Sequence, residues 1–204
     1  MKQIDYYSFG PSPFTYLGHQ HIQDVAKKHG ATIKVKPFAI MDVWAISGAL
    51  PPGQRPPVRQ RYRSLELQRI AQMRNLPIVQ TPAFFPLDPT VTDSVVIALQ
   101  ERGESPFEYM DKAFRGVWVD DANMADEAEI EKRLTECGFD AASVIAEAKG
   151  DEVAAIRAQN TADANAADVV GAPAYVVDGE VFWGQDRIDF IDHMLTTGRE
   201  AFKA

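Results

Sequence analysis

The order of strand and helix patterns along this chain restricts its possible folds more than any single motif does. Strand patterns occur only near the two ends, at Ile4–Phe9, Thr32–Val35, Ala174–Val177 and Glu180–Trp183. A helix pattern separates the first two strands, which therefore run parallel, whereas Asp178-Gly179 joins the last two in a tight antiparallel hairpin. A final helix begins at Gly184-Gln185-Asp186 and continues through Met194. This order predicts a mixed four-stranded sheet.

The first helix has clear start and stop signals. Ser12 is a favourable N-cap and Pro13 suits the first helical position. Lys27, Lys28 and Gly30 are typical of a helix end. The sequence therefore predicts a helix that begins directly after the first strand and ends before the second.

The middle of the chain, residues 38–170, contains helix patterns and no convincing strand. The predicted helices are Gln60–Asn75, Asp93–Arg102, Pro106–Val119, Asp126–Cys137, Asp140–Ala148 and Asp151–Val169. We therefore predict that residues 1–37 and 171–204 form one domain and that residues 38–170 form an inserted helical domain. Within it, the acidic stretch Asp120–Glu136 is expected to be a solvated helix face.

Composition excludes several classes of protein. The 204 residues include 21 Lys and Arg against 29 Asp and Glu, and the net charge of −8 disfavours nucleic acid and anionic membranes as partners. No apolar run is long enough to span a membrane, and Asp5 lies where a signal peptide would be apolar. One cysteine, Cys137, allows neither an intrachain disulfide nor a thiolate metal cluster. We expect a cytoplasmic protein.

The order of elements resembles a thioredoxin-like α/β fold, βαβ followed by ββα, with a large helical insertion as in DsbA and the kappa-class glutathione transferases. In such folds the reactive site lies where the first strand meets the first helix, and disulfide oxidoreductases carry C-x-x-C there. Here the same place reads Ser12-Pro13-Phe14-Thr15. Since thiol–disulfide exchange needs a thiolate, the chain cannot perform it alone. The Ser12 hydroxyl at a helix N-terminus favours a bound anion, such as the thiolate of a small cofactor, but it also fits a simple N-cap.

Two blocks of sequence extend this resemblance to a particular family. Asp5–Leu17 (DYYSFGPSPFTYL) resembles the opening of the 2-hydroxychromene-2-carboxylate isomerases, which are relatives of the kappa-class glutathione transferases. The second block consists of Gly171–Pro173 (GAP), Val176–Glu180 (VVDGE) and Phe182–Arg187 (FWGQDR). The two blocks lie at opposite ends, so the resemblance covers essentially the whole chain.

This resemblance implies a glutathione site. Ser12 would donate a hydrogen bond to the glutathione sulfur and favour the thiolate, and Pro173 would face it as a cis-proline. The backbone of Ala172 would pair with the cysteinyl part of glutathione, and Asp186 would bind the ammonium of its γ-glutamyl end. Asp186 also fits a structural role as a first-turn helix carboxylate. Two further residues of the matching blocks are expected at the site, Phe14 and Gln185.

Six arginines gather between Arg55 and Arg74, where Glu66 is the only acid. Arginine binds carboxylates in a bidentate manner, and both glutathione and a chromene carboxylate offer them. The resemblance places a basic residue, a tyrosine and an acid at these spacings, and Arg59, Tyr62 and Glu66 fit. The alternative is a surface arginine cluster with an ion pair between Glu66 and Arg69. Relatives often have an asparagine just before the proline pair of this segment, whereas Ala49-Leu50 offers none.

The four histidines do not form a site. No grouping of His, Cys and carboxylates has the spacing of metal ligands. His21 shares the apolar face of the first helix with Leu17 and Ile22 and is expected to be a core or interface residue. His19 is expected to point away from that face.

The leading hypothesis is a homodimeric, glutathione-dependent cis–trans isomerase of aromatic hydrocarbon degradation. In the chemistry that the resemblance implies, the glutathione thiolate adds reversibly to the conjugated system of a small aromatic carboxylate or another electrophile and thereby permits rotation. A kappa-class-like glutathione transferase or peroxidase is the first alternative. The second is a redox-inactive, DsbA-like binding protein in which the hydroxyls mark a lost redox function.

Overall fold

The predicted mixed sheet is confirmed in the computed structural model, which describes residues 1–203. Its strands, in the spatial order β2-β1-β3-β4, are β1 (Gln3–Ser8), β2 (Thr32–Pro37), β3 (Ala174–Val177) and β4 (Glu180–Trp183). β1 runs parallel to β2 and antiparallel to β3, and β3 is antiparallel to β4. Asp178 and Gly179 join the last pair and both have positive φ, as the tightest hairpin turns require.

The helices account for most of the remaining chain. Nine of those described are α-helices: α1 (Pro13–His29), α2 (Ile40–Ser47), α3 (Pro57–Met73), α4 (Thr90–Glu101), α5 (Phe107–Trp118), α6 (Glu127–Glu136), α7 (Ala141–Ala148), α8 (Asp151–Ala166) and α9 (Ile188–Thr197). Two short 3₁₀ turns accompany them, η1 (Pro52–Gln54) and η2 (Gln185–Arg187). Across residues 1–203, no helix is both long and apolar enough to cross a membrane.

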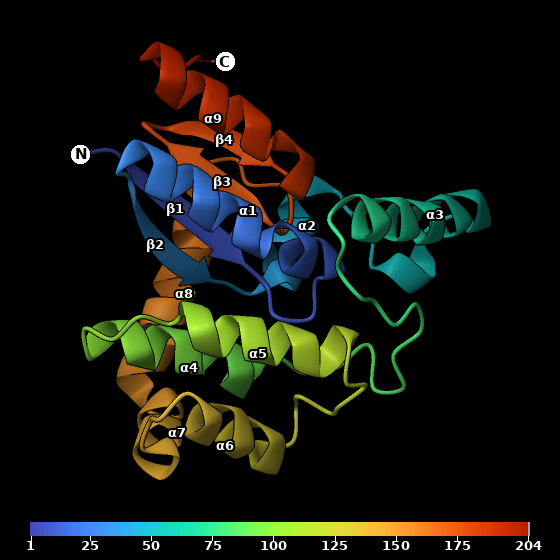
Figure 1. The fold of residues 1–204 in the computed structure, drawn as a ribbon, viewed down its shortest axis with the longest axis vertical. Coiled ribbons are helices and arrows are strands. Elements are labelled where there is room, and N and C mark those ends of the chain that lie inside the picture. Colours follow the sequence, from blue (N-terminus) through green and yellow to red (C-terminus); the bar gives the residue numbers. More distant parts are fainter. Residues whose placement is uncertain (204) are drawn as a thin grey trace.

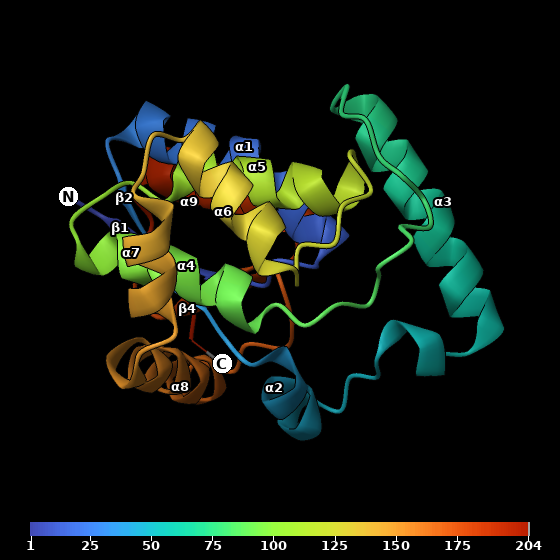
Figure 2. The ribbon, with the colours of Figure 1, turned by 90° about the horizontal axis from the view of Figure 1, so that it is seen from below.

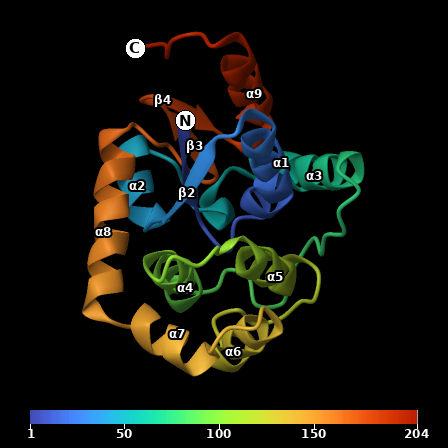
Figure 3. The ribbon, with the colours of Figure 1, turned by 60° about the vertical axis from the view of Figure 1, so that its left-hand side comes forward.

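Alternation along β1 gives each face of the sheet its own apolar core, because successive side chains of a strand point to opposite faces. Tyr6 packs in the core that includes α1 and α9, whereas Tyr7 packs with Phe38 and with residues of α2 and α8. Accordingly α1 and α9 lie on one face of the sheet and α2 and α8 on the other (Figure 1, Figure 3).

The helices α4–α7 stack beyond the β2 side of the sheet (Figure 1). The α4 residue Gln100 holds this junction, because its side-chain amide accepts from the N–H of Val35 at 3.0 Å and donates to the carbonyl of Val35 at 2.9 Å. The edge of β2 is thereby covered by a side chain in place of another strand. One apolar core continues from the sheet into these helices. The division at residues 37 and 170 into two domains stays a prediction.

The helix α3 stands apart from this stack and is joined to its neighbours by extended segments (Figure 2). It begins at Pro57, three residues earlier than predicted, and its buried residues are Leu67, Ile70 and Ala71. The helix α2 was not predicted from the sequence. Its N-cap is Ala39, which has no side-chain hydrogen bond to offer, so the usual start signal is missing.

His19, which the sequence places off the apolar stripe of α1, is nevertheless not exposed. His19 is buried, with Nε2 3.3 Å from the carbonyl oxygen of Phe107 and its ring edge-on to Phe114. His21 is partly exposed and lies 2.8 Å from Asp189 of α9. The reason is that α1 packs on two sides, against the sheet and α9 on one and against α5 on the other.

Candidate active site

The turn between β1 and α1 places Ser12 at the start of the helix. Its backbone N–H donates to the carbonyl of Phe9 at 2.9 Å and closes the turn. The backbone of Ser12 is extended, and its Oγ accepts from the N–H of Thr15 at 3.2 Å. Ser12 is therefore the N-cap that the sequence predicts.

The hydroxyl of Ser12 also reaches the other end of the chain. It donates to the carbonyl oxygen of Ala172 at 3.3 Å, across 160 residues of sequence. The predicted cis peptide bond between Ala172 and Pro173 is confirmed. The carbonyl group that accepts the Ser12 hydrogen bond belongs to this same peptide bond. Ser12 Oγ thus accepts one hydrogen bond and donates another, and these two bonds fix the orientation of the hydroxyl. The residue is nearly buried, with 8% of its surface exposed.

A cavity of about 800 Å³ opens beside this pair. Its walls come from the start of α1, from α2 and the segment after it, from α3, from Gly171-Ala172 and from the segment after β4. Six of the residues predicted for the site line it: Phe14, Arg59, Tyr62, Ala172, Gln185 and Asp186. The other two, Ser12 and Pro173, do not line it; both are buried directly beside its lining residue Ala172.

Three arginines line the cavity without acid partners: Arg55, which lies just before α3, and Arg59 and Arg63 within α3. Among residues 1–203, none of the three has a carboxylate within 4.0 Å. The guanidinium of Arg63 lies 5.9 Å from the ring centroids of both Phe14 and Phe85. Burial, reinforced by the charge of Arg55, lowers the pKa of Arg63, and burial with the charge of Arg59 lowers that of Arg55.

The acids of the cavity do not balance these charges. Glu66 is 3.1 Å from Arg69, the ion pair that the sequence suggested, and Asp186 pairs with its neighbour Arg187. The cavity therefore carries an excess of positive charge in a chain whose net charge is −8. Such a wall favours an anionic ligand.

Arg74 has a different role from the other arginines of the segment. It donates to the carbonyl of Leu17 at 2.9 Å and to the carbonyl of Gln185 at 3.3 Å, and so ties the end of α3 to α1 and η2. Gln185 itself is buried, and its Oε1 has no partner in the described part of the chain. Leu65 and Met73 of α3 are exposed and do not line the cavity.

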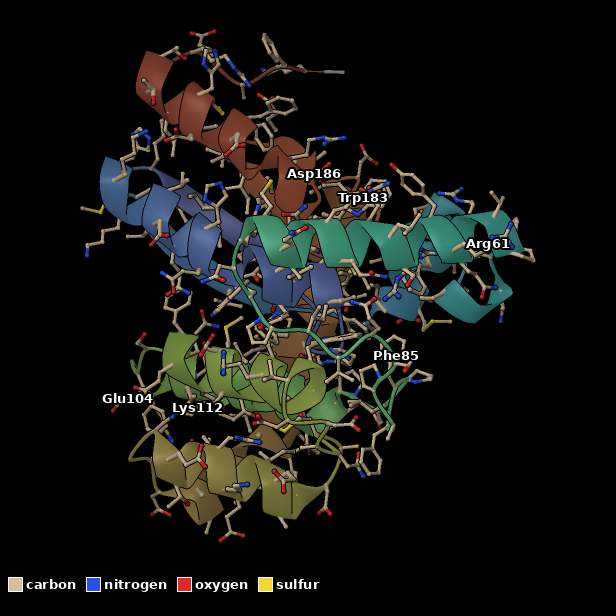
Figure 4. All side chains as sticks on the ribbon, turned by 45° about the vertical axis from the view of Figure 1, so that its right-hand side comes forward. Arg61, Phe85, Glu104, Lys112, Trp183 and Asp186 are labelled. Carbon is tan, nitrogen blue, oxygen red and sulfur yellow. The ribbon has the colours of Figure 1, made fainter. Side chains whose placement is uncertain are left out.

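The opposite wall is built by close packing around glycines. A Cβ on Gly171 would lie 3.0 Å from Nε1 of Trp183, so the Trp183 indole would have to shift, whereas Nε1 of Trp44 at 3.5 Å would be at ordinary contact distance. Gly184 has φ +107°, and a Cβ there would collide with the carboxylate of Asp186. Figure 4 shows Trp183 and Asp186 beside α3, with Arg61 near the outer end of that helix.

The position of the missing asparagine faces the cavity. Ala49 and Leu50 line it without offering an amide side chain. Instead Arg55 donates from Nε to the carbonyl of Leu50 at 2.8 Å and lies over the ring of Trp44. An arginine thus occupies this corner of the site.

Sequence reasoning missed Asp93. This α4 residue is 3% exposed, and its Oδ1 accepts from the N–H of Gly10 at 2.9 Å, within the turn that leads to Ser12. Burial raises its pKa to about 7. A signal was available, because Asp93 is the one acid in the otherwise uncharged segment Val91–Leu99.

Cys137 does not line the cavity. Burial and the nearby Glu108 raise the pKa of its thiol to about 11, which leaves it protonated and unreactive at neutral pH. Among residues 1–203, no group of three or more His, Cys, Asp or Glu side chains could hold a metal ion.

Comparisons with known proteins concern the sequence and the fold as a whole. Residues 3–196 match the model of the DSBA-like thioredoxin domain. The 2-hydroxychromene-2-carboxylate isomerase of Sphingobium xenophagum is 27% identical over 196 residues, which are 95% of this chain and 98% of that protein. A solved 2-hydroxychromene-2-carboxylate isomerase (HCCA isomerase) superposes with a TM-score of 0.80 at 23% identity, over 96% of this chain and 95% of the other. The cytosolic disulfide reductase DsbM of Pseudomonas aeruginosa, solved with GSH, reaches 0.70 at 15% identity, over 96% and 98%.

Proposed function

Because the chain belongs to the DSBA-like thioredoxin domain family, we propose that it is a glutathione-dependent isomerase of small aromatic carboxylates. One observation carries this proposal. A serine hydroxyl replaces the expected thiol at the start of α1, beside the Ala172–Pro173 bond, and the adjoining cavity is lined by arginines without acid partners. The names of its curated relatives, 2-hydroxychromene-2-carboxylate isomerase, support the reaction type.

The residues present fit glutathione. Ala172 precedes β3, which begins at Ala174, so its backbone lies outside the strand ladder and suits pairing with an extended peptide. The carboxylate of Asp186 is largely exposed and suits an ammonium group, since its pairing with the adjacent Arg187 is a weak surface interaction. Arg59 suits a carboxylate. When bound, glutathione supplies the thiolate that Cys137 cannot provide.

The task of Ser12 is to hold a proton at Oγ. The hydroxyl already accepts from Thr15, so its own hydrogen points toward Ala172, at the edge of the cavity. An anion placed there is a stronger acceptor than the Ala172 carbonyl, whose bond is long at 3.3 Å. The N-terminus of α1 favours the same negative charge.

The second reactant would occupy the arginine side of the cavity. The cavity volume of about 800 Å³ lies within the usual range of ligand pockets, about 300–1,000 Å³, and the cavity is partly open to solvent. Arg63 lies over Phe14, the second residue of the helix that Ser12 caps, which puts a cation close to the reactive end. The aromatic rings beside it suit a flat substrate.

Two measurements test this function. Calorimetry with reduced glutathione is expected to show binding at a single site, and absence of binding favours the DsbA-like binding protein instead. With 2-hydroxychromene-2-carboxylate and glutathione, the expected product is the isomer, with glutathione recovered unchanged. Accumulation of a stable glutathione conjugate would identify a transferase. Sedimentation of the purified protein tests the homodimer, which remains a prediction.

A further inference from the structure

The turn that carries Ser12 is attached to the helical segment through one buried contact. Asp93 lies in the first turn of α4, and its Oδ1 accepts from the N–H of Gly10 at 2.9 Å. Gly10 comes two residues before Ser12 and lies inside the turn that the Ser12 N–H closes onto Phe9. A single side chain of α4 therefore fixes the peptide plane that leads into the serine.

The approach between turn and helix is tight. A Cβ on Gly10 would lie 2.8 Å from Oδ1 of Asp93 and 3.8 Å from Cγ2 of Thr92. Any side chain at position 10 would push the turn away from α4. The contact therefore depends on Gly10, which has no side chain, and on the short side chain of Asp93, whose Oδ1 accepts the hydrogen bond.

We propose that Asp93 is a positioning residue for Ser12, holding Gly10 so that the serine hydroxyl keeps its place beside Ala172. Only one consequence of this inference rests on the proposed function, namely the effect of Asp93 on the thiol of bound glutathione. The contact with Gly10 is independent of any ligand.

The carboxyl group is also placed to respond to pH. The charged or titratable groups that face the Asp93 carboxyl are Arg157 of α8, Asp88 before α4 and Tyr109 of α5. Arg157 lowers the pKa of Asp93, but burial raises it by more. Its second oxygen, Oδ2, has no hydrogen-bond partner within residues 1–203. With its pKa raised to about 7, the group changes charge near neutrality. The ionised form is the stronger acceptor for Gly10 N–H, so the turn is held more firmly above pH 7.

Three variants separate the possible roles. Asp93→Asn keeps an acceptor for Gly10 but cannot ionise. Asp93→Val removes the acceptor and leaves the Gly10 N–H buried without a partner. Asp88→Asn is the control, because it removes a nearby exposed charge without touching Gly10.

The first experiment uses the ligand-free protein. The amide resonances of Gly10 and Ser12 are followed by NMR from about pH 5 to about pH 9, which covers the Asp93 pKa of about 7 with about 2 pH units on either side. In the wild type and in Asp88→Asn both amides are expected to titrate together, and in Asp93→Asn both are expected to stay constant. Amides that do not titrate in the wild type, or that still titrate in Asp93→Asn, overturn the proposal.

The second experiment measures the pKa of the bound glutathione thiol and the steady-state constants. In Asp93→Val the thiol pKa is expected to rise and kcat to fall, with KM for the substrate little changed. In Asp93→Asn, which keeps an acceptor for Gly10, the thiol pKa and kcat are expected to be close to the wild-type values. A folded Asp93→Val variant with wild-type values refutes the positioning role. If the wild type binds no glutathione, the proposed function fails, and the amide titration alone decides whether Asp93 holds the turn.

Discussion

Ser12 combines a structural and a chemical role in one hydroxyl, and substitutions can separate the two. Its Oγ caps α1 by accepting from Thr15, and it donates toward Ala172 at the edge of the cavity. Removing the cap costs about 1 kcal/mol when alanine replaces serine, but only about a few tenths when glycine does. We therefore expect Ser12→Gly to be nearly as stable as the parent and yet to lose the thiolate absorbance of bound glutathione at neutral pH.

Urea denaturation and ultraviolet difference spectra on the same samples check this prediction. Ser12→Ala is expected to lose both stability and thiolate. Cys137→Ser is the matched control and is expected to retain full turnover, since that thiol stays protonated. Thiolate and turnover that survive in Ser12→Gly would show that the serine is only a helix cap.

Arg63 is the residue at which the charge of the cavity can be tested. It lies between two aromatic rings without an acid partner among residues 1–203. A hydrogen bond to a charged group contributes about 1.5–3 kcal/mol. We expect Arg63→Gln to raise KM for a carboxylate substrate by about tenfold to a hundredfold, at 1.4 kcal/mol per tenfold, with glutathione binding unchanged.

The matched control for Arg63 is Arg61→Gln, which removes an equal charge from the exposed part of the same helix. Steady-state kinetics at constant ionic strength compare the two. Equal increases in KM in both variants would mean that the arginines of α3 act only through their summed positive charge. An unchanged KM in Arg63→Gln would mean that the substrate carboxylate binds elsewhere.

At the scale of the elements, α1 is held between the sheet and α5, and His19 is the polar group at the second contact. Burial lowers the pKa of His19 to about 4, against 6.5 in an unfolded chain. The unfolded state therefore binds more protons in this interval, and the contribution of His19 to stability is complete above pH 6.5 and is lost as pH falls through 4. We expect His19→Gln, whose amide can still donate to Phe107, to lose less stability than the wild type between these values.

Urea midpoints measured at pH 7, 6, 5 and 4 check this prediction, with the pH points spanning about the interval between the two pKa values. The exposed His193→Gln is the control. Parallel curves for wild type and His19→Gln would mean that His19 has the same pKa in the folded and unfolded states, which would contradict the prediction.

The sequence predicted the order of elements well and the packing of helices less well, for a physical reason. Strands and caps depend on local signals such as Ser12, Gly30 and Asp178-Gly179, and the structure has all three as expected. Burial depends on how many partners a helix has. A periodicity analysis finds one apolar stripe on α1, so it could not identify the second contact that buries His19.

The candidate site divides in the same way. The cavity gathers six predicted residues because they come from two matching blocks and one arginine-rich helix. The lone acid Asp93 stands out in the uncharged segment Val91–Leu99, but its partner could not be predicted, because a backbone N–H 83 residues away leaves no mark in the sequence. The corner formed by Arg55 and Leu50 was also unpredictable, since a guanidinium bound to a carbonyl there requires the turn after α2, a helix that no cap signalled.

At the scale of the whole molecule, one apolar core joins the sheet to α4–α7, and the Ser12 turn lies at that junction. A continuous core predicts a single thermal transition in which both predicted domains melt together, rather than two. Calorimetric and van't Hoff enthalpies that agree would support this expectation, and two resolved transitions would support the division at residues 37 and 170.

Glutathione should then raise the stability of the entire molecule, because a ligand that binds only the folded state adds RT ln(1 + [L]/Kd), roughly 2.7 kcal/mol at a hundredfold excess over Kd. For a chain of this length each kcal/mol raises Tm by about 2–4 °C, so an increase of about 5–10 °C is expected under that condition. Asp186→Ala is expected to reduce this increase, because it removes the exposed carboxylate that faces the cavity, while leaving Tm without ligand nearly unchanged. Its control is Asp189→Ala, which removes a neighbouring carboxylate outside the cavity lining and should respond to glutathione as the wild type does. A Tm that does not respond to glutathione in any of these proteins would leave a thioredoxin-like molecule whose cavity binds some other anion.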